Sequence, residues 1–254
     1  MKYIKEWLKE NKIFFETIAI VLLSTMAIIV SIQSNKISSS QLRIAEDQKR
    51  IMVAQNLPLL RLNAYQVYTK ETDKYSEDII KIVNEGPPLY EFHKDYVVFI
   101  EFEFGKRGEA LSKILIPLNG YYGSSFLTGE SKNLLCTITG PKNKLKYDNF
   151  ISEFRSLAEK EGYYAFDKLR RFININYKDL FEQRHSDFYE VDFFNSKKME
   201  PEEGQKYFTL HYQSHTNLSL VEFTTIFPDE IFGKCKMILP NKANSADTKS
   251  RAAD

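Results

Sequence analysis

The chain has 254 residues, and its 35 Lys and Arg nearly balance its 34 Asp and Glu, so the formal net charge is +1. This balance argues against a positive field built to capture nucleic acid. The two cysteines are too few for a disulfide framework, and they lack the CxxC spacing of a metal site.

Phe and Tyr are abundant, with 19 and 15 residues, whereas Gly and Pro are scarce, with 10 and 8. Aromatic side chains fit half-buried pleated surfaces, so this composition favours sheet. The wealth of Lys, Asn, Ile, Phe and Tyr is also typical of AT-rich bacterial or phage genomes, which is an association without a physical cause. We therefore expect a sheet-rich protein of bacterial or phage origin.

The first residues, MKYIKEWLKENK, place Ile4, Trp7 and Leu8 on one helical face with lysines around it. Tryptophan and tyrosine prefer the headgroup level of a membrane, and lysine side chains extend to that level or contact anionic lipid. We therefore expect residues 1–12 to form a basic interfacial segment.

Residues 13–32, IFFETIAIVLLSTMAIIVSI, are the most apolar stretch of the chain. At a rise of about 1.5 Å per residue they span about 30 Å, the thickness of a bilayer's hydrocarbon core, and Glu16 is the one costly residue. A buried core helix is the alternative, but such a helix normally shows a polar face. A cleaved signal peptide would have a shorter apolar run and a small-residue cleavage site. The sequence therefore predicts one transmembrane helix, a signal-anchor that makes the chain a single-pass cell-membrane protein.

Lysines and arginines near the two ends of this span decide its orientation. Four lysines precede the span, against Lys36 and Arg43 in the next fifteen residues, which would put the soluble domain outside the cell. Extending the count to Lys49 and Arg50 removes the difference. The charge count therefore assigns no side of the membrane to the domain.

Residues 33–56 are predicted to continue as a helical stalk, because they are rich in helix formers and contain no Gly or Pro. Ile37, Ile44 and Ile51 recur every seven residues, as in one half of a coiled-coil seam, while polar or small residues occupy the other half. The pattern predicts either a weak homo-oligomer through these isoleucines or a solvated spacer. Pro58 should end the helix, since the residue before a proline is pushed out of the helical region.

Residues 57–241 are long enough for one domain with its own core. Alternating apolar and polar residues predict strands over residues 60–66, 78–83, 98–104, 113–118, 133–139, 172–177, 187–194, 207–213 and 219–227. A helical apolar stripe predicts one helix that Asp148 caps and Gly162 closes. The predicted fold is mainly β, an antiparallel two-sheet β-sandwich with one packed helix, followed by a disordered tail over residues 242–254.

Three segments carry a family resemblance, namely SNKISSSQLRIAEDQKRIMVAQNLP, IVNEGPPLYEF and ININYKDLFEQRH. In this order they resemble uncharacterised bacterial single-pass membrane proteins with an N-terminal anchor, a Gln-rich helical stalk, a proline and a β-sandwich domain. The resemblance implies a fold and a membrane placement. It carries over no catalytic residue.

Patterns typical of catalysis are incomplete in this chain. The run Gly123-Ser124-Ser125-Phe126-Leu127 lacks the last glycine of a nucleophile elbow, so it fits a turn as well as a catalytic serine. Pro228-Asp229 with Lys234 and Lys236 resembles a nuclease core, but no acidic residue stands two positions before either lysine. The sequence contains no phosphate-binding glycine loop and no HExxH motif.

Two histidines and two acids are further candidates. His211 and His215 in a predicted strand would lie about 13 Å apart at about 3.3 Å per residue, too far for one metal ion unless the strand bends near Ser214. Two solvent-facing histidines are the alternative. Glu190 and Asp192 would share a strand face, either as an acid and base pair or as ordinary surface charges.

The remaining features are charge and thiols. The only concentrated positive charge would contact lipid headgroups or form a solvated face; it comprises Lys142, Lys144, Lys146, Lys168, Arg170 and Arg171. Cys136 and Cys235 are expected to be buried reduced thiols, with a single disulfide as the alternative.

No catalytic, cofactor-binding or metal-ligating set assembles from these patterns. We therefore expect a membrane-anchored, non-catalytic domain whose surface binds an unknown protein partner, with the lipid bilayer as a second partner and no nucleic acid. The alternative is a membrane-tethered hydrolase whose pocket is built from residues distant in sequence, for which Glu190, Asp192 and His211 are the residues to test.

Overall fold

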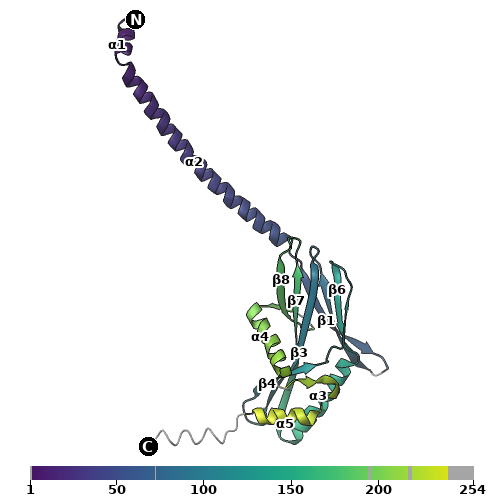
Figure 1. The fold of residues 1–254 in the computed structure, drawn as a ribbon. Helices are drawn as coiled ribbons and strands as arrows, with labels where there is room; N and C mark the ends of the chain where they lie inside the picture. Colours follow the sequence, from purple (N-terminus) through teal and green to yellow (C-terminus); the bar gives the residue numbers. More distant parts are fainter. Residues whose placement is uncertain (1, 72, 194–195, 217–218, 240–254) are drawn as a thin grey trace, which may run out of the picture. The chain divides into compact units, whose positions relative to one another are not determined.

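The computed structural model describes residues 2–71, 73–193, 196–216 and 219–239 (Figure 1). Contacts divide the chain into two compact units, Met1–Asn56 and Leu57–Asp254. The predicted tail over residues 242–254 lies outside the described residues. The two units are described in turn.

Two helices make up the first unit, α1 (Lys2–Glu10) and α2 (Lys12–Gln55). Asn11 separates them, and its side-chain amide donates to the carbonyl of Trp7 at 2.9 Å. The apolar stretch and the predicted stalk belong to one continuous helix, which ends at Gln55, shortly before Pro58.

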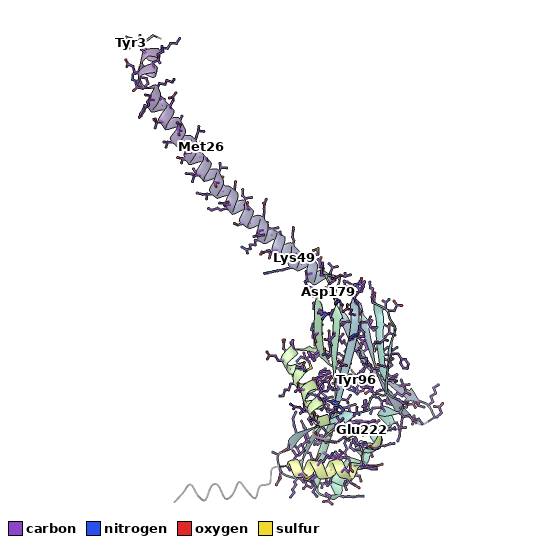
Figure 2. All side chains as sticks on the ribbon, viewed as in Figure 1. Tyr3, Met26, Lys49, Tyr96, Asp179 and Glu222 are labelled. Atoms are coloured by element: carbon purple, nitrogen blue, oxygen red, sulfur yellow. The ribbon has the colours of Figure 1, made fainter. Side chains whose placement is uncertain are left out.

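Helix α2 is long and apolar enough to cross a membrane by length and composition, and it is the one such helix in the described part of the chain. None of its residues is buried, and Figure 2 shows its side chains, Met26 among them, radiating from the ribbon. Thr17, Ser24 and Thr25 donate their hydroxyls to carbonyls one turn earlier at 2.7 to 2.8 Å. These polar groups therefore stay paired along an apolar surface.

The second unit contains a four-stranded antiparallel sheet with the spatial order β1-β2-β6-β5. Its strands are β1 (Leu60–Thr69), β2 (Lys74–Asn84), β5 (Ser124–Leu127) and β6 (Asn133–Thr139). The strands predicted at residues 60–66, 78–83 and 133–139 are confirmed. Strand β5 was not predicted, because its SSFL sequence has no alternation and Phe126 and Leu127 are exposed.

The other sheet has six strands in the order β10-β4-β3-β7-β8-β9. They are β3 (Tyr90–Lys106), β4 (Ser112–Asn119), β7 (Tyr163–Lys178), β8 (Arg184–Glu190), β9 (Lys197–Met199) and β10 (Val221–Glu222). The strands predicted at 98–104, 113–118 and 172–177 are confirmed. The prediction of a wholly antiparallel fold is wrong at one edge, where β10 pairs in parallel with β4.

Three α-helices accompany the sheets, where one was predicted: α3 (Asn143–Lys160), α4 (Pro201–Thr216) and α5 (Pro228–Ile238). Gly162 follows α3 with φ +78°, as predicted for a closing glycine. The prediction that Asp148 caps α3 is wrong, because the helix begins five residues earlier and Asp148 lies in its second turn.

The strand predicted over residues 207–213 is wrong, because this segment belongs to α4. The buried residues of α4, Gly204, Phe208, His211 and Ser214, recur at helical spacing, and that period prevails over the local alternation. The strand predicted over residues 219–227 is also wrong for most of its length. It contains only the two residues of β10, then a 3₁₀ turn, η1 (Phe223–Thr225).

The six-stranded sheet has buried side chains on both faces. On one face Val98, Ile100 and Phe102 join a large cluster that also contains inward residues of β1, β2 and β6 and residues of α3 and α5. On the other face Val97, Phe99 and Phe172 pack with Phe208 of α4. Cys136 and Cys235 are buried and free, as expected for reduced thiols.

Candidate functional site

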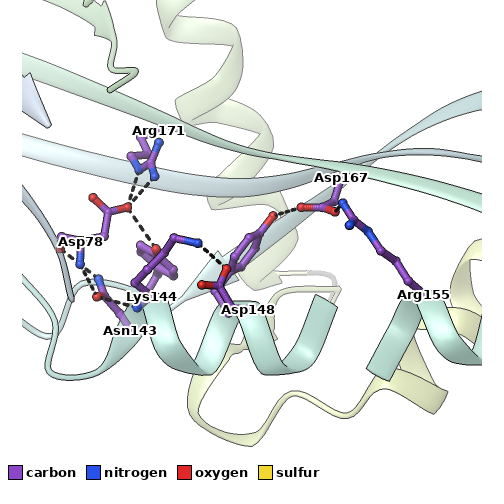
Figure 3. Close-up of polar contacts among 9 residues, drawn as sticks. Asp78, Asn143, Lys144, Asp148, Arg155, Asp167 and Arg171 are labelled. Atoms are coloured by element: carbon purple, nitrogen blue, oxygen red, sulfur yellow. Dashed lines mark hydrogen bonds and ion pairs between the residues drawn. The ribbon is translucent and has the colours of Figure 1, made fainter. Parts of the chain in front are cut away.

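A buried ion pair joins the two sheets inside the domain. Asp78 on β2 is fully buried, and the side chain of Arg171 on β7 is 3% exposed. Both Nε and Nη2 of Arg171 donate to Oδ2 of Asp78, with Nε at 2.9 Å (Figure 3). A charge pair this deep requires further partners, because burial removes the water that otherwise solvates each ion.

Tyr121 and Asn143 supply those partners. The Tyr121 hydroxyl donates to Asp78 Oδ2 at 3.0 Å, while the side-chain amide of Asn143 bonds both the N–H and the C=O of Asp78 at 2.8 and 3.2 Å. Burial, and then the Asp78 carboxylate, hold the pKa of Tyr121 well above its usual value, so this hydroxyl remains a donor. Oδ1 of Asp78 has no hydrogen-bond partner. The hydroxyl of the neighbouring Tyr122 is also buried without a partner, so two oxygens beside the ion pair are left unsatisfied.

A second polar chain runs beside the ion pair at the surface of α3. The Tyr147 hydroxyl donates to Asp167 at 2.7 Å, Arg155 donates to the other oxygen of Asp167, and Lys144 pairs with Asp148 (Figure 3). Burial, and then Asp167, raise the pKa of Tyr147 well above its usual range. The two bonds to Asp167 hold α3 against β7, whereas the Lys144–Asp148 pair lies within α3.

The predicted concentration of positive charge is dispersed by pairing. Arg171 is buried against Asp78, Arg170 bonds Glu101 and Glu190 at 3.1 and 2.9 Å, and Lys168 lies 3.9 Å from Asp192. Each cation therefore has a carboxylate within reach. The expected cationic face is wrong for Arg170 and Arg171, whose side chains are 17% and 3% exposed, whereas Lys168 is exposed as a solvated face requires.

Two hollows follow the outer edge of β1. One, of about 170 Å³, is lined by Gln66, Lys144, Tyr147, Arg171, Asp192 and Phe193. The other, of about 220 Å³, is lined by Leu60 to Asn63 and again by Asp192 and Phe193. Phe193 lies between them with its ring 4.4 Å from the Arg171 guanidinium. A cation–π contact between Arg171 and Phe193 therefore lies beside the edge of β1.

The hydrogen-bond register shows which backbone groups of β1 point away from β2. The N–H of Glu85 donates to the carbonyl of Leu59, so the odd-numbered residues of β1 up to its bulge pair with β2. Leu62, Ala64 and Gln66 therefore direct their backbone groups away from β2. Ser196 donates to the carbonyl of Leu62 at 2.8 Å. In the described part of the chain no strand pairs with this side of β1.

A third hollow, of about 500 Å³, lies at the hairpin between β7 and β8. His93, Asn176 and Ser186 stand in one cross-strand row, with Lys178 and Arg184 in the lining. At its rim the imidazole Nε2 of His185 donates to Asp179 Oδ2 at 2.8 Å, and the N–H groups of Phe181 and Gln183 donate to Oδ1.

Burial raises the pKa of the Asp179 carboxyl, but the bonds from His185, Gln183 and Phe181 outweigh it, and the net pKa lies below its usual value. The carboxylate therefore stays ionised and locks the hairpin. Tyr177 stacks on His185 at 5.0 Å between ring centroids, which holds the imidazole in place.

The candidates from the sequence do not assemble into a catalytic group. Strand β8 ends at Glu190, so Glu190 and Asp192 do not share a strand face, and each pairs with a cation instead. Ser124 lies in β5, and Asp229 stands on α5 with Lys236, which pairs with Glu161. His211 and His215 lie one helical turn apart with ring centroids 5.2 Å apart, so the predicted separation of about 13 Å is wrong.

From the sequence, Arg171 was assigned to a solvated or lipid-contacting cluster, and the roles of Asp78 and Asp179 were missed. The sequence does carry a signal for Asp78 and Arg171. Each lies on the inward face of its strand, and the next residue on that face, Ile80 or Ile173, belongs to the core. A charge at an inward position requires a buried partner. Asp179 carries the weaker signal of an Asp in a turn.

Among the described residues, no group of three His, Cys, Asp or Glu side chains is placed to hold a metal ion. No protein-family model matches the chain, and a search of curated proteins finds no match.

Proposed function

We propose that this chain is a single-pass membrane protein whose second unit, a two-sheet sandwich, binds an extended peptide segment of a partner protein along the free edge of β1. The membrane part rests on α2, and the binding part rests on the edge of β1 with which no described strand pairs.

The exposed apolar surface of α2 supports the anchor. Ten aliphatic side chains in residues 13–32 are exposed: Ile13, Ile18, Ile20, Val21, Leu22, Leu23, Ile28, Ile29, Val30 and Ile32. If burial of each contributes about 1.5 kcal/mol, transfer to lipid stabilises the chain by on the order of 15 kcal/mol. Water is therefore an unfavourable solvent for this segment, and a bilayer core is a favourable one.

The shared core supports the sandwich. Leu62 and Ile80 from one sheet and Ile100 and Ile173 from the other belong to the same buried cluster, and the Asp78–Arg171 pair also joins the two sheets. Face-to-face packing is the arrangement that buries one face of each sheet in a single core.

The edge of β1 supports peptide binding. Backbone N–H and C=O groups at alternate positions of an edge strand are satisfied by another extended backbone, which adds a strand to the sheet. The hollows on both sides of Phe193 would take alternate side chains of that strand. Their lining mixes Lys144, Lys168 and Arg171 with Asp167 and Asp192, so it favours a peptide without strong net charge.

A photocrosslinking experiment tests this binding mode. A photoreactive amino acid at Asn63 on β1 should capture a partner in membranes, whereas the same amino acid at Lys81 on β2 should not. Changing Gln66 to Pro removes an outward N–H while sparing the β1–β2 ladder, so it should abolish capture, and Gln66→Thr should retain it. Equal capture from both positions, or capture that survives Gln66→Pro, would reject strand addition.

Membrane extraction tests the anchor. The full-length protein should stay in the membrane pellet at alkaline pH, and a chain without residues 1–32 should be released. The mass of the purified protein should include the N-terminal segment. A mature chain that begins after residue 32 would show a signal sequence instead of an anchor.

A hydrolase is the second candidate function, and the Asp179–His185 pair beside the 500 Å³ hollow favours it. A buried carboxylate that orients an imidazole is the arrangement of a general base. His185→Gln, with folding intact, should abolish hydrolysis of ester or amide substrates if this reading holds. If the unchanged protein hydrolyses none of these ester or amide substrates, the hydrolase function is rejected.

A further inference from the structure

The imidazole of His211 carries an unused lone pair inside the domain. His211 is 6% exposed, and its Nε2–H donates to the carbonyl of Leu118 at 3.1 Å. A carbonyl only accepts, so the proton is on Nε2 and Nδ1 is an acceptor. This Nδ1 is buried without a hydrogen-bond partner. A buried polar atom left in this way calls for a water or an ion.

The bond to Leu118 is also the usual support of a metal ligand. Histidines that bind metal ions typically donate their second ring N–H to a carbonyl or carboxylate, which fixes the tautomer and the ring orientation. Phe99 packs edge-on against the His211 ring at 5.7 Å between centroids and restricts it further.

A second imidazole lies on the same face of α4. Side chains four residues apart on a helix are neighbours, and each leans toward the helix N-terminus, so His215 leans over His211. The ring centroids are 5.2 Å apart. Two histidines at this spacing on one helix form the metal-binding pair of the HExxH motif.

We propose that His211 Nδ1 and the imidazole of His215 bind one late first-row divalent transition-metal ion, with Cu²⁺ bound most tightly. The described residues offer no third His, Cys, Asp or Glu ligand here, so water completes the coordination. Structural Zn²⁺ sites need four protein ligands, whereas tetragonal Cu²⁺ and Ni²⁺ accept mixed nitrogen and oxygen donors. Affinity rises from Ni²⁺ to Cu²⁺ in the usual order. This site is independent of the proposed peptide edge.

Copper titration of the full-length protein in detergent, without a polyhistidine tag, tests the site. Isothermal titration should give one Cu²⁺ per chain, and the electron paramagnetic resonance spectrum should show hyperfine coupling to imidazole nitrogen. His215→Gln should weaken binding at least about tenfold, since losing even an outer-shell partner of a ligand costs about that much. Because His215 is exposed, this variant leaves the core unchanged.

His93→Gln is the matched control. His93 is exposed, and its Nδ1 is already 2.8 Å from the carbonyl of Phe92, so its loss should leave copper binding unchanged. His211→Gln is a second variant that should abolish the nitrogen coupling, with circular dichroism as the check on folding. Copper binding that survives His215→Gln, that is lost in His93→Gln, or that is absent from the unchanged protein at tens of micromolar would overturn the site.

Discussion

Replacing Arg171 with Met should unfold the domain at a much lower temperature, because the change leaves Asp78 charged and buried without its cation. Arg171 supplies two of the three donors to Asp78 Oδ2, and Tyr121 alone would remain. Removing one partner of a buried pair typically costs about 3 to 5 kcal/mol. At about 2 to 4 °C per kcal/mol for a domain of this size, the melting temperature should fall by about 6 to 20 °C.

The double variant Asp78→Leu with Arg171→Met separates the charge from the packing. Both ions are then absent, and apolar side chains of similar volume fill the same space, which is often neutral or stabilising. The double variant should therefore recover most of the loss. Thermal unfolding would be followed by circular dichroism on a chain without residues 1–32, since Trp7, the only tryptophan, lies in the removed segment.

Two outcomes would refute the reasoning. A drop of less than about 1 kcal/mol for Arg171→Met, the range of an exposed pair, would mean that water reaches Asp78. A double variant no more stable than the single one would mean that Arg171 acts through its packing on Phe193 and not through its charge.

Three further predictions follow from individual contacts. Gly204→Ala should destabilise the domain by about 1 to 3 kcal/mol, since a Cβ there would lie 2.3 Å from Phe188. Gly233→Ala on α5 should instead stabilise the domain by about 0.5 to 1 kcal/mol, because a Cβ there would have nothing within 4 Å. Equal effects of the two substitutions in urea unfolding would contradict the close packing at Gly204. The Asp179 pKa is lowered on folding, so its contribution to stability is present above its ordinary value of 3.8 and is lost as pH falls through the folded-state value. The difference in unfolding free energy between the unchanged protein and Asp179→Asn should therefore be largest near neutral pH and shrink below about pH 4. A pH-independent difference would show that the ionised Asp179 carboxylate does not stabilise the β7–β8 hairpin. Ile44→Cys should form a disulfide-linked dimer in membranes if Ile37, Ile44 and Ile51 associate, and no dimer there would make α2 beyond the apolar stretch a spacer.

The sequence alone determined the apolar span and the inner strands, because these depend on local composition and period. Residues 13–32 are mostly apolar and long enough to cross a bilayer, and α2 leaves them exposed. The alternation in β3 and β7 matches the pleat, and inward residues such as Ile100, Phe102 and Ile173 are buried. Local period also placed Gly162 at the end of α3.

Only the tertiary structure decided α4, the edge strands and the candidate sites. Residues 207–213 alternate like a strand, but the segment forms the helix α4. Only a helix buries Gly204, Phe208, His211 and Ser214 on one face. Gly204 is required because α4 approaches Phe188 closely at that position. Asp78 and Arg171 are 93 positions apart, and the pairing of β2 and β7 through a common core brings them together. The outward backbone groups of β1 and the lone pair of His211 likewise depend on which described residues surround them, which no local period encodes.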